Sequence, residues 1–232
     1  MFSKKFICLI ALLCLSLFLA CGVGGGDDPE DDKIYTVSFP LMEGVTWIYN
    51  CSETDPDTQY VTTKVISGTV VFSEDTLGYV QPDYPVGLSW FRQVDQDSSF
   101  FLNDGDYVWM GEVNTTIEEF GGNPFVPFRV IPLEFAIGDT FTTLIHKQVG
   151  PLSADITFFI TVIGVEDVTV PAGTFEDCLR LDAILAVSFG NDTILSTIWC
   201  ADEVGLVKRD DYYESGSDHS YYEELTSYDV TP

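Results

Sequence analysis

The chain has 232 residues, 46% of them hydrophobic, and its 10 basic side chains stand against 37 acidic ones, giving a formal net charge of −27 at pH 7. This composition excludes a collagen, a coiled coil and a wholly disordered chain. It also excludes a nucleic-acid partner, because a phosphate backbone requires a basic protein face.

The first 20 residues predict an exported protein. Lys4 and Lys5 precede an apolar run from Phe6 to Ala20. The run is shorter than the roughly 20 residues that span a bilayer, but it is typical of the core of a secretory signal peptide. An uncleaved anchor helix is the less favoured alternative.

The residues around Cys21 carry a second signal. Phe18, Leu19, Ala20 and Cys21 resemble the lipobox of bacterial lipoproteins, whose cysteine is acylated and becomes the new N-terminus. The resemblance implies cleavage after Ala20 and lipidation of Cys21. The alternative is an ordinary signal peptide in which Cys21 is incidental. Because anionic lipids repel an acidic body, we expect acyl chains on Cys21 to hold the protein on the membrane.

Residues 21 to 33 form the predicted tether. This segment is rich in glycine and acidic residues, so it cannot bury apolar surface and should remain flexible. We expect a single β domain over residues 34 to 232. Gly22 stands where inner-membrane lipoproteins of Gram-negative bacteria usually carry Asp, and this resemblance favours the outer membrane of the cell envelope.

The rest of the chain alternates with a period of two. Apolar residues occupy the odd positions from Leu179 to Phe189 and the even positions from Ala154 to Val162, as in strands with one buried face. Further strand-like runs cover residues 45 to 51, 59 to 66, 69 to 73, 88 to 94, 107 to 112, 140 to 148, 193 to 200, 204 to 213 and 219 to 228.

Hairpin turns separate several of these runs, namely Asn103-Asp104-Gly105, Gly190-Asn191-Asp192 and Ser215-Gly216-Ser217. The predicted fold class is therefore all-β. It consists of a single curved, mostly antiparallel sheet, a half-barrel or a nearly closed barrel, with at most one short helix around residues 115 to 121.

A short pattern occurs twice. Phe39-Pro40-Leu41 leads to Gly44-Val45-Thr46-Trp47, and Ile131-Pro132-Leu133 leads to Gly138-Asp139-Thr140-Phe141. We interpret it as the same loop-to-strand entry in two halves of the sheet, although coincidence is an alternative.

Several motifs resemble a broad group of uncharacterised secreted bacterial proteins and lipoproteins. They are Val170-Pro171-Ala172-Gly173-Thr174-Phe175 followed by Cys178, Trp199-Cys200-Ala201, Val204-Gly205-Leu206-Val207-Lys208 and the opening Gly44-x-x-Trp47-x-Tyr49. The resemblance implies a curved sheet similar to that of periplasmic lipoprotein carriers and no established activity. From the residues alone, Pro171, Ala172 and Gly173 indicate a turn, so the first motif is predicted to be a hairpin joint.

No pattern indicates a catalytic residue, a cofactor or a metal ion. His146 and His219 have no partner at a ligand spacing, and Gly87-Leu88-Ser89-Trp90-Phe91 fails as a nucleophile elbow. The acidic loop that contains Asp95, Asp97, Asn103, Asp104 and Asp106 is an alternative calcium site.

Three cysteines remain besides Cys21 in the exported part. A short loop at 190 to 192 would place Cys200 opposite Asp182, too far from Cys178 for a disulfide, whereas a longer loop would bring the pair together. The family resemblance implies a Cys178–Cys200 disulfide and leaves Cys51 as a buried thiol.

The C-terminal region repeats a tyrosine pattern. Asp211-Tyr212-Tyr213-Glu214 and Ser220-Tyr221-Tyr222-Glu223 flank a turn. They indicate cross-strand pairs in a final hairpin, with a tyrosine recognition surface as the alternative.

Three functions remain. The first is a non-enzymatic, lipid-anchored envelope protein that binds an apolar ligand or a partner protein on the concave face of its sheet. The second is a surface or scaffold lipoprotein without a pocket. The third is a carboxylate-based hydrolase, which would require a buried carboxylate with a raised pKa.

Replacing Cys21 tests the predicted anchor. Cys21→Ser should abolish incorporation of radiolabelled palmitate and release the protein from the membrane fraction, because the serine hydroxyl does not replace the acylated thiol. Unchanged labelling or unchanged fractionation would contradict lipidation at this residue.

Overall fold

The computed structural model describes residues 33–52, 59–72, 87–93, 99–113, 125–149, 152–188, 193–213 and 220–231. Ile34–Pro232 forms one compact unit. The leader, Cys21, all but the last residue of the tether and the short helix expected around 115 to 121 lie outside the described residues. Among the described segments, none forms a helix that is long and apolar enough to cross a membrane.

Two antiparallel sheets account for the secondary structure of the described chain. The smaller sheet pairs β1 (Tyr35–Thr36) with β8 (Glu134–Phe135). The larger one has twelve strands, so the predicted all-β fold is confirmed. Its strands are β2 (Thr46–Ser52), β3 (Gln59–Val71), β4 (Ser89–Gln93), β5 (Phe100–Asn103), β6 (Tyr107–Val113), β7 (Phe125–Pro132), β9 (Thr140–Val149), β10 (Leu152–Val170), β11 (Gly173–Val187), β12 (Thr193–Ala201), β13 (Gly205–Tyr213) and β14 (Ser220–Asp229).

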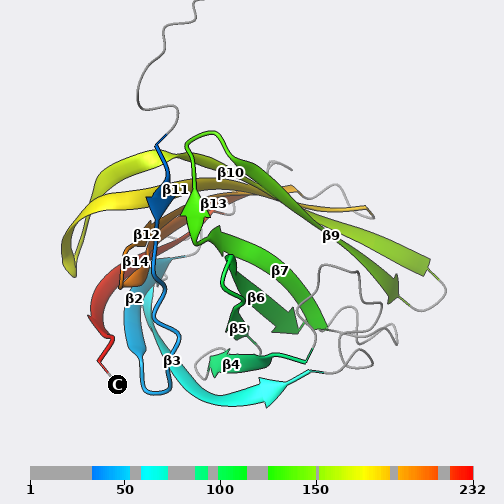
Figure 1. The fold of residues 1–232 in the computed structure, drawn as a ribbon, viewed down its shortest axis with the longest axis horizontal. Coiled ribbons are helices and arrows are strands. Elements are labelled where there is room, and N and C mark those ends of the chain that lie inside the picture. Colours follow the sequence, from blue (N-terminus) through cyan, green and yellow to red (C-terminus); the bar gives the residue numbers. More distant parts are fainter. Residues whose placement is uncertain are drawn as a thin grey trace, which may run out of the picture. The chain divides into compact units, whose positions relative to one another are not determined.

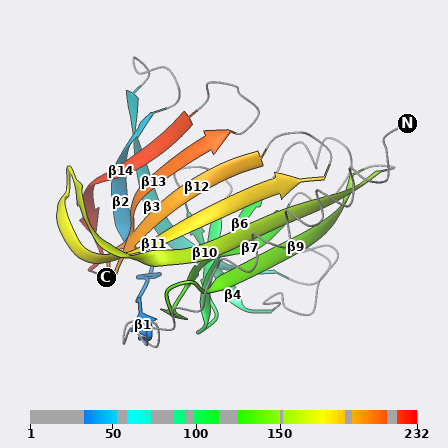
Figure 2. The same ribbon diagram turned by 90° about the horizontal axis from the view of Figure 1, so that it is seen from above.

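The large sheet consists of two six-stranded meanders. Strands β2 to β7 form one and strands β9 to β14 form the other, and the two join through the pairing of β2 with β14. In Figure 1 the second meander arches over the first, and Figure 2 shows its strands side by side from β14 to β9.

The free edges of this sheet, β7 and β9, approach each other. The backbone N–H of Arg129 in β7 donates to Oγ1 of Thr143 in β9 at 3.3 Å. Nearby, the ring centroids of Phe128 and Phe158 are 4.7 Å apart. The sheet is therefore nearly closed into a barrel with a defined interior.

The repeated loop-to-strand pattern has the same backbone geometry in both halves. The N–H of Gly44 donates to the carbonyl of Ile66 at 2.9 Å, and the N–H of Gly138 donates to the carbonyl of Val162 at 2.9 Å. Both glycines have a positive φ, 96° and 91°, which a residue with a Cβ adopts at a cost. The repeat predicted from the sequence is confirmed.

The predicted hairpin joint is also confirmed. Val170 pairs with Gly173, so Pro171 and Ala172 form a two-residue loop between β10 and β11. Strand β7 was not predicted from the sequence, because its two prolines argue against a strand. They are tolerated because β7 is an edge strand. The length of β10 was underestimated, because two register shifts interrupt the alternation of apolar residues after Val162.

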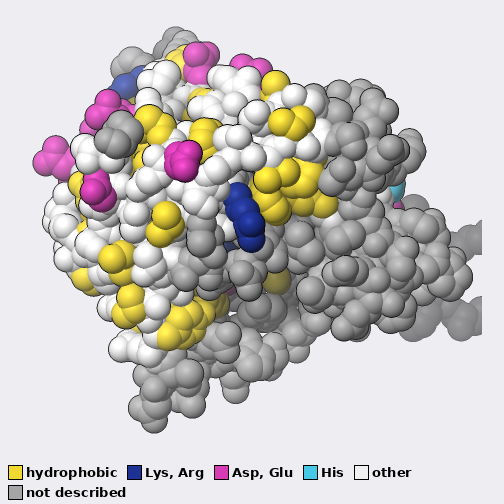
Figure 3. Space-filling model, turned by 90° about the horizontal axis from the view of Figure 1, so that it is seen from below, with side chains coloured by type: hydrophobic (Ala, Val, Ile, Leu, Met, Phe, Trp, Pro, Cys, Tyr) yellow, Lys and Arg dark blue, Asp and Glu magenta, His cyan; other side chains and the backbone are white. Residues whose placement is uncertain are grey.

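The outer surface mixes side chains of different kinds. On the face shown in Figure 3, hydrophobic clusters are scattered over the described surface, acidic side chains gather toward the upper left and a basic side chain lies near the centre. Val61, Val71 and Tyr212 are among the exposed hydrophobic residues. Isolated exposed apolar side chains are normal on a protein surface, so none of these marks a site by itself.

An aromatic cluster fills one end of the barrel. The ring of Phe125 lies 4.3 Å from that of Phe72 and 5.6 Å from those of Trp90 and Phe100, measured between centroids. Gly111 on β6 lies against Phe125, and a Cβ at this position would overlap the Phe125 ring. Close packing of the cluster therefore depends on glycine at this position.

Gly111→Ala should lower the free energy of unfolding by about 1–3 kcal/mol, because Phe125 must shift within a packed core. Gly164→Ala is the matched control, since a Cβ there meets nothing within 4 Å. Urea denaturation monitored by tryptophan fluorescence measures both variants. Equal losses would show that the Phe125 contact does not determine the effect.

Candidate functional site

The barrel encloses a cavity of about 360 Å³. Every strand of the twelve-stranded sheet except β9 contributes a lining residue, and Phe39 adds a ring from the segment between β1 and β2. The cavity is thus formed by the concave face of the sheet, where a ligand-binding site was predicted from the sequence.

Most of the cavity wall is apolar. Phe101, Met110 and Phe128 line it from the first meander, and Phe158 and Leu185 line it from the second. Side chains of this kind exclude water and favour an apolar ligand by roughly 25 cal/mol for each Å² of apolar surface removed from water.

Two aromatic residues of β2 are fixed by the Val204–Lys208 motif. Trp47 donates its indole N–H to the carbonyl of Val204 at 2.7 Å, and Tyr49 donates its hydroxyl to the carbonyl of Leu206 at 2.8 Å. Because both polar atoms are satisfied, the rings of Trp47 and Tyr49 present apolar surface to the cavity.

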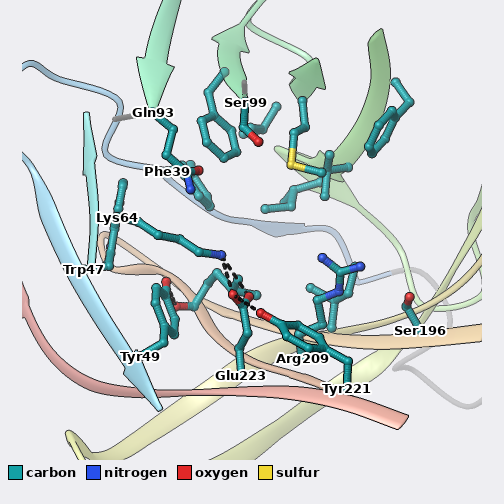
Figure 4. Close-up of a pocket in the computed structure, with 18 of the residues that line it drawn as sticks. Phe39, Trp47, Tyr49, Lys64, Gln93, Ser99, Ser196, Arg209, Tyr221 and Glu223 are labelled. Atoms are coloured by element: carbon teal, nitrogen blue, oxygen red, sulfur yellow. Dashed lines mark hydrogen bonds and ion pairs between the residues drawn. The ribbon is translucent and has the colours of Figure 1, made fainter. Parts of the chain in front are cut away.

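One side of the interior carries an inner polar cluster, defined as Lys64, Arg209, Asp211, Tyr221 and Glu223. The sheet register creates it, because Arg209 pairs with Glu223 and Asp211 pairs with Tyr221 on neighbouring strands β13 and β14. Figure 4 shows Lys64 reaching Glu223 from β3, with Tyr221 on the same carboxylate.

Glu223 is the centre of this cluster and is only 2% exposed. The Lys64 ammonium lies 2.7 Å from Oε1 and 2.9 Å from Oε2, and the Tyr221 hydroxyl donates to Oε1 at 2.7 Å. Burial alone raises the pKa of Glu223, but the charges of Lys64 and Arg209 and these hydrogen bonds bring its pKa below the ordinary value. The carboxylate is therefore ionised at neutral pH.

The second ion pair joins neighbours on β13. Arg209 Nε and Nη2 lie 2.8 Å and 2.6 Å from the two carboxylate oxygens of Asp211, a bidentate contact. Burial, followed by the Glu223 charge, raises the pKa of Tyr221, so its hydroxyl remains a donor. The cluster holds two cations and two carboxylates, and its formal charges cancel.

Two further polar side chains face the cavity. Gln93 is 3% exposed and Ser196 is 8% exposed, and both line the cavity. Within the described part of the chain, neither side chain forms a hydrogen bond and neither has a polar atom sealed from solvent, so both groups are reachable from the cavity. In Figure 4, Gln93 extends into the cavity from the side opposite Glu223 and Tyr221.

The cysteines proposed for a disulfide lie close together. Cys200 on β12 pairs with Leu179 on β11, the residue after Cys178. Ala186 pairs with Thr193, so the loop between β11 and β12 is longer than the predicted short loop of residues 190 to 192. Cys178, Cys200 and Cys51 are buried free thiols. Burial raises the pKa of Cys178 to about 11, which keeps it protonated. The Cys178–Cys200 disulfide stays a prediction.

The alternative metal and catalytic residues are not brought together. His146 forms an exposed pair with Asp155, and the side-chain oxygens of Asn103 and Asp104 accept backbone N–H groups of their own turn. His219, Asp95 and Asp97 lie outside the described residues. Across the described segments, no group of three or more potential ligands is suitable for a metal ion.

The inner polar cluster was not predicted from the sequence. A signal was present, because Tyr221, Glu223 and Leu225 alternate on one face of β14, and a carboxylate among inward positions implies a buried partner. The identity of that partner could not be read from the sequence, since Lys64 lies on β3, 159 positions away.

Comparison with known proteins gives limited matches. The DUF3108-like family model matches residues 153–224, which is less than half of the chain and includes both the Val170–Phe175 and the Val204–Lys208 motifs. The comparison with curated proteins gives no match. The expected resemblance is thus supported at the level of this family match.

Two solved structures are similar at low identity. One, from Parabacteroides distasonis ATCC 8503 and described as a lipoprotein, has 14% identity and a TM-score of 0.47, with 84% of this chain and 99% of that chain covered. The other, from Bacteroides fragilis NCTC 9343, is described as an exported protein with a YmcC-like fold. It has 15% identity and a TM-score of 0.41, with 84% of this chain and 100% of that chain covered. Neither likeness identifies a ligand or an activity.

Lys64→Met should lower the free energy of unfolding at neutral pH by about 3–5 kcal/mol, because it leaves the buried Glu223 carboxylate without its main counter-ion. Adding Glu223→Gln to this variant should restore part of the loss. Chemical denaturation measures both. Equal stability of the single and double variants would contradict a buried charge as the cause.

The pH dependence provides a second readout of the same variant. Because the folded pKa of Glu223 is lowered, its stabilisation is full above the unfolded carboxyl pKa and is lost as pH falls through the folded pKa. In Lys64→Met the carboxylate can be protonated more easily, so the difference from the unmodified protein should shrink at acidic pH.

Proposed function

We propose that this protein is a non-enzymatic, lipid-anchored protein of the cell envelope that binds an apolar ligand inside its barrel. Signal cleavage after Ala20 and acylation of Cys21 would provide the anchor, and the outer membrane is the favoured location. The observation that carries the binding proposal is the cavity on the concave face, with its mostly apolar lining.

The size of the cavity supports this function. Ligand pockets range from about 300 to 1,000 Å³, and the interior volume of about 360 Å³ falls within that range. A scaffold without a ligand would be expected to fill its interior with its own aromatic side chains, as the cluster around Phe125 does at one end of the barrel. The cavity therefore favours binding over display alone.

The chemistry of the interior argues against the hydrolase alternative. A carboxylate-based hydrolase needs one carboxyl group with a raised pKa as its general acid. Glu223, the buried carboxylate that lines the cavity, has a lowered pKa and two firm partners. Its geometry is suited to holding neighbouring side chains in place rather than to donating a proton.

Native mass spectrometry of the full chain extracted from its own membrane tests the proposal. We expect a co-purified apolar molecule in the unmodified protein and its loss in Val130→Trp, which places a larger side chain at a cavity-lining position. Val61→Trp, at an exposed position on β3, is the matched control and should retain the ligand.

The same spectra report on the anchor and on the predicted disulfide. An unoccupied cavity in every preparation, or equal occupancy in both tryptophan variants, would overturn the binding site. A chain whose mass shows no acylation would overturn the anchor independently of the ligand.

A further inference from the structure

The polar groups inside the barrel specify what kind of apolar molecule fits. We propose that the ligand is an uncharged amphiphile, with a hydrocarbon chain against the apolar wall and a neutral head that forms a hydrogen bond with Gln93 or with Ser196, which lie on different sides of the cavity in Figure 4. This inference rests on the proposed function and names the ligand class of the same cavity.

The charge balance of the site is the first argument for a neutral head. Lys64, Arg209 and Glu223 are the charged residues that line the cavity in the described part of the chain. Each is already in an ion pair, Lys64 with Glu223 and Arg209 with the buried Asp211. An ionised head would therefore leave water for an interior that offers it no unpaired counter-ion.

This desolvation cost applies to an anionic head and to a cationic head alike. An anionic head would also approach a protein with a formal net charge of −27. A cationic head would compete for Glu223, whose oxygens already accept from Lys64 and Tyr221. A neutral head avoids both costs because it disturbs neither ion pair.

The polar side chains of Gln93 and Ser196 are the second argument for a neutral head. Both side chains line the cavity, and in the described part of the chain neither forms a hydrogen bond or has a polar atom sealed from solvent. A ligand that displaces water from such a group must replace the lost hydrogen bond. An amide both donates and accepts, as does a hydroxyl, so their complement is an ester, amide or hydroxyl group.

The shape of the site supports a head attached to a chain. Gln93 enters from the side opposite Glu223 and Tyr221, and residues such as Phe128 and Leu185 complete an apolar wall. At about 30 Å³ for each water-sized group, the volume of about 360 Å³ accommodates roughly a dozen heavy atoms. A medium-length acyl chain with a small neutral head matches these dimensions.

Three probes with the same chain length distinguish the possibilities: decanamide with a neutral head, decanoate with an anionic head, and decane with no head. Each is titrated into the full chain in detergent, with Val130→Trp used to subtract partitioning into micelles. We expect decanamide to bind at least about tenfold more tightly than decanoate at neutral pH.

Two variants assign the head to its partner. One of them, Gln93→Met or Ser196→Ala, should weaken binding of decanamide about threefold to tenfold, the equivalent of one hydrogen bond, and both should leave decane binding unchanged. The matched controls Gln59→Met and Ser89→Ala lie at exposed positions and should change neither affinity. Unfolding midpoints of the variants establish that the fold is retained.

The outcomes separate this inference from the proposed function. If decanoate binds as tightly as decanamide, or if neither Gln93→Met nor Ser196→Ala weakens decanamide binding, the neutral-head inference is wrong while the apolar site stands. If no probe binds more strongly to the unmodified protein than to Val130→Trp, the proposed function itself fails.

Discussion

The approach of β7 to β9 is the constraint on which the rest of this structure depends. A curved sheet of twelve strands exposes one concave face, and apolar side chains on that face remain dry only if the sheet edges come together. The contacts of Arg129 with Thr143 and of Phe128 with Phe158 hold these edges together. Without them the concave face would be open to water.

The continuous pairing of β13, β14, β2 and β3 creates the inner polar cluster. Lys64 and Tyr221 contact Glu223, and Arg209 contacts Asp211. Buried ion pairs contribute little net stability compared with well-packed apolar side chains, because desolvation offsets their attraction. Their main consequence here is geometric, since Glu223 positions the Lys64 chain and the Tyr221 hydroxyl beside the cavity. A neutral, preorganised polar wall opposite an apolar one is a suitable environment for an amphiphile.

The two meanders make different contributions to this site. The first, from β2 to β7, supplies Lys64, Gln93 and much of the apolar wall, and it contains the aromatic cluster around Phe125. The second, from β9 to β14, supplies both carboxylates, Arg209 and Ser196. Each begins with the same backbone hydrogen bond, in which the N–H of Gly44 or Gly138 joins a loop to the following hairpin. The cavity therefore lies between two related halves rather than within either of them.

The sequence by itself determined the fold class, the repeated entry to the two halves and the hairpin at Pro171 and Ala172, because alternation, glycine and proline act over a few neighbouring residues. It also predicted the concave face as the place for a ligand. It missed β7, since prolines are compatible with a strand only at an edge, and edges are defined by the whole sheet. Only the tertiary structure decided the partnership of Lys64 with Glu223 and the place of Gln93 and Ser196 on the cavity wall, because the pairing of β2 with β14 and the curvature of the sheet bring together residues that are far apart in the chain.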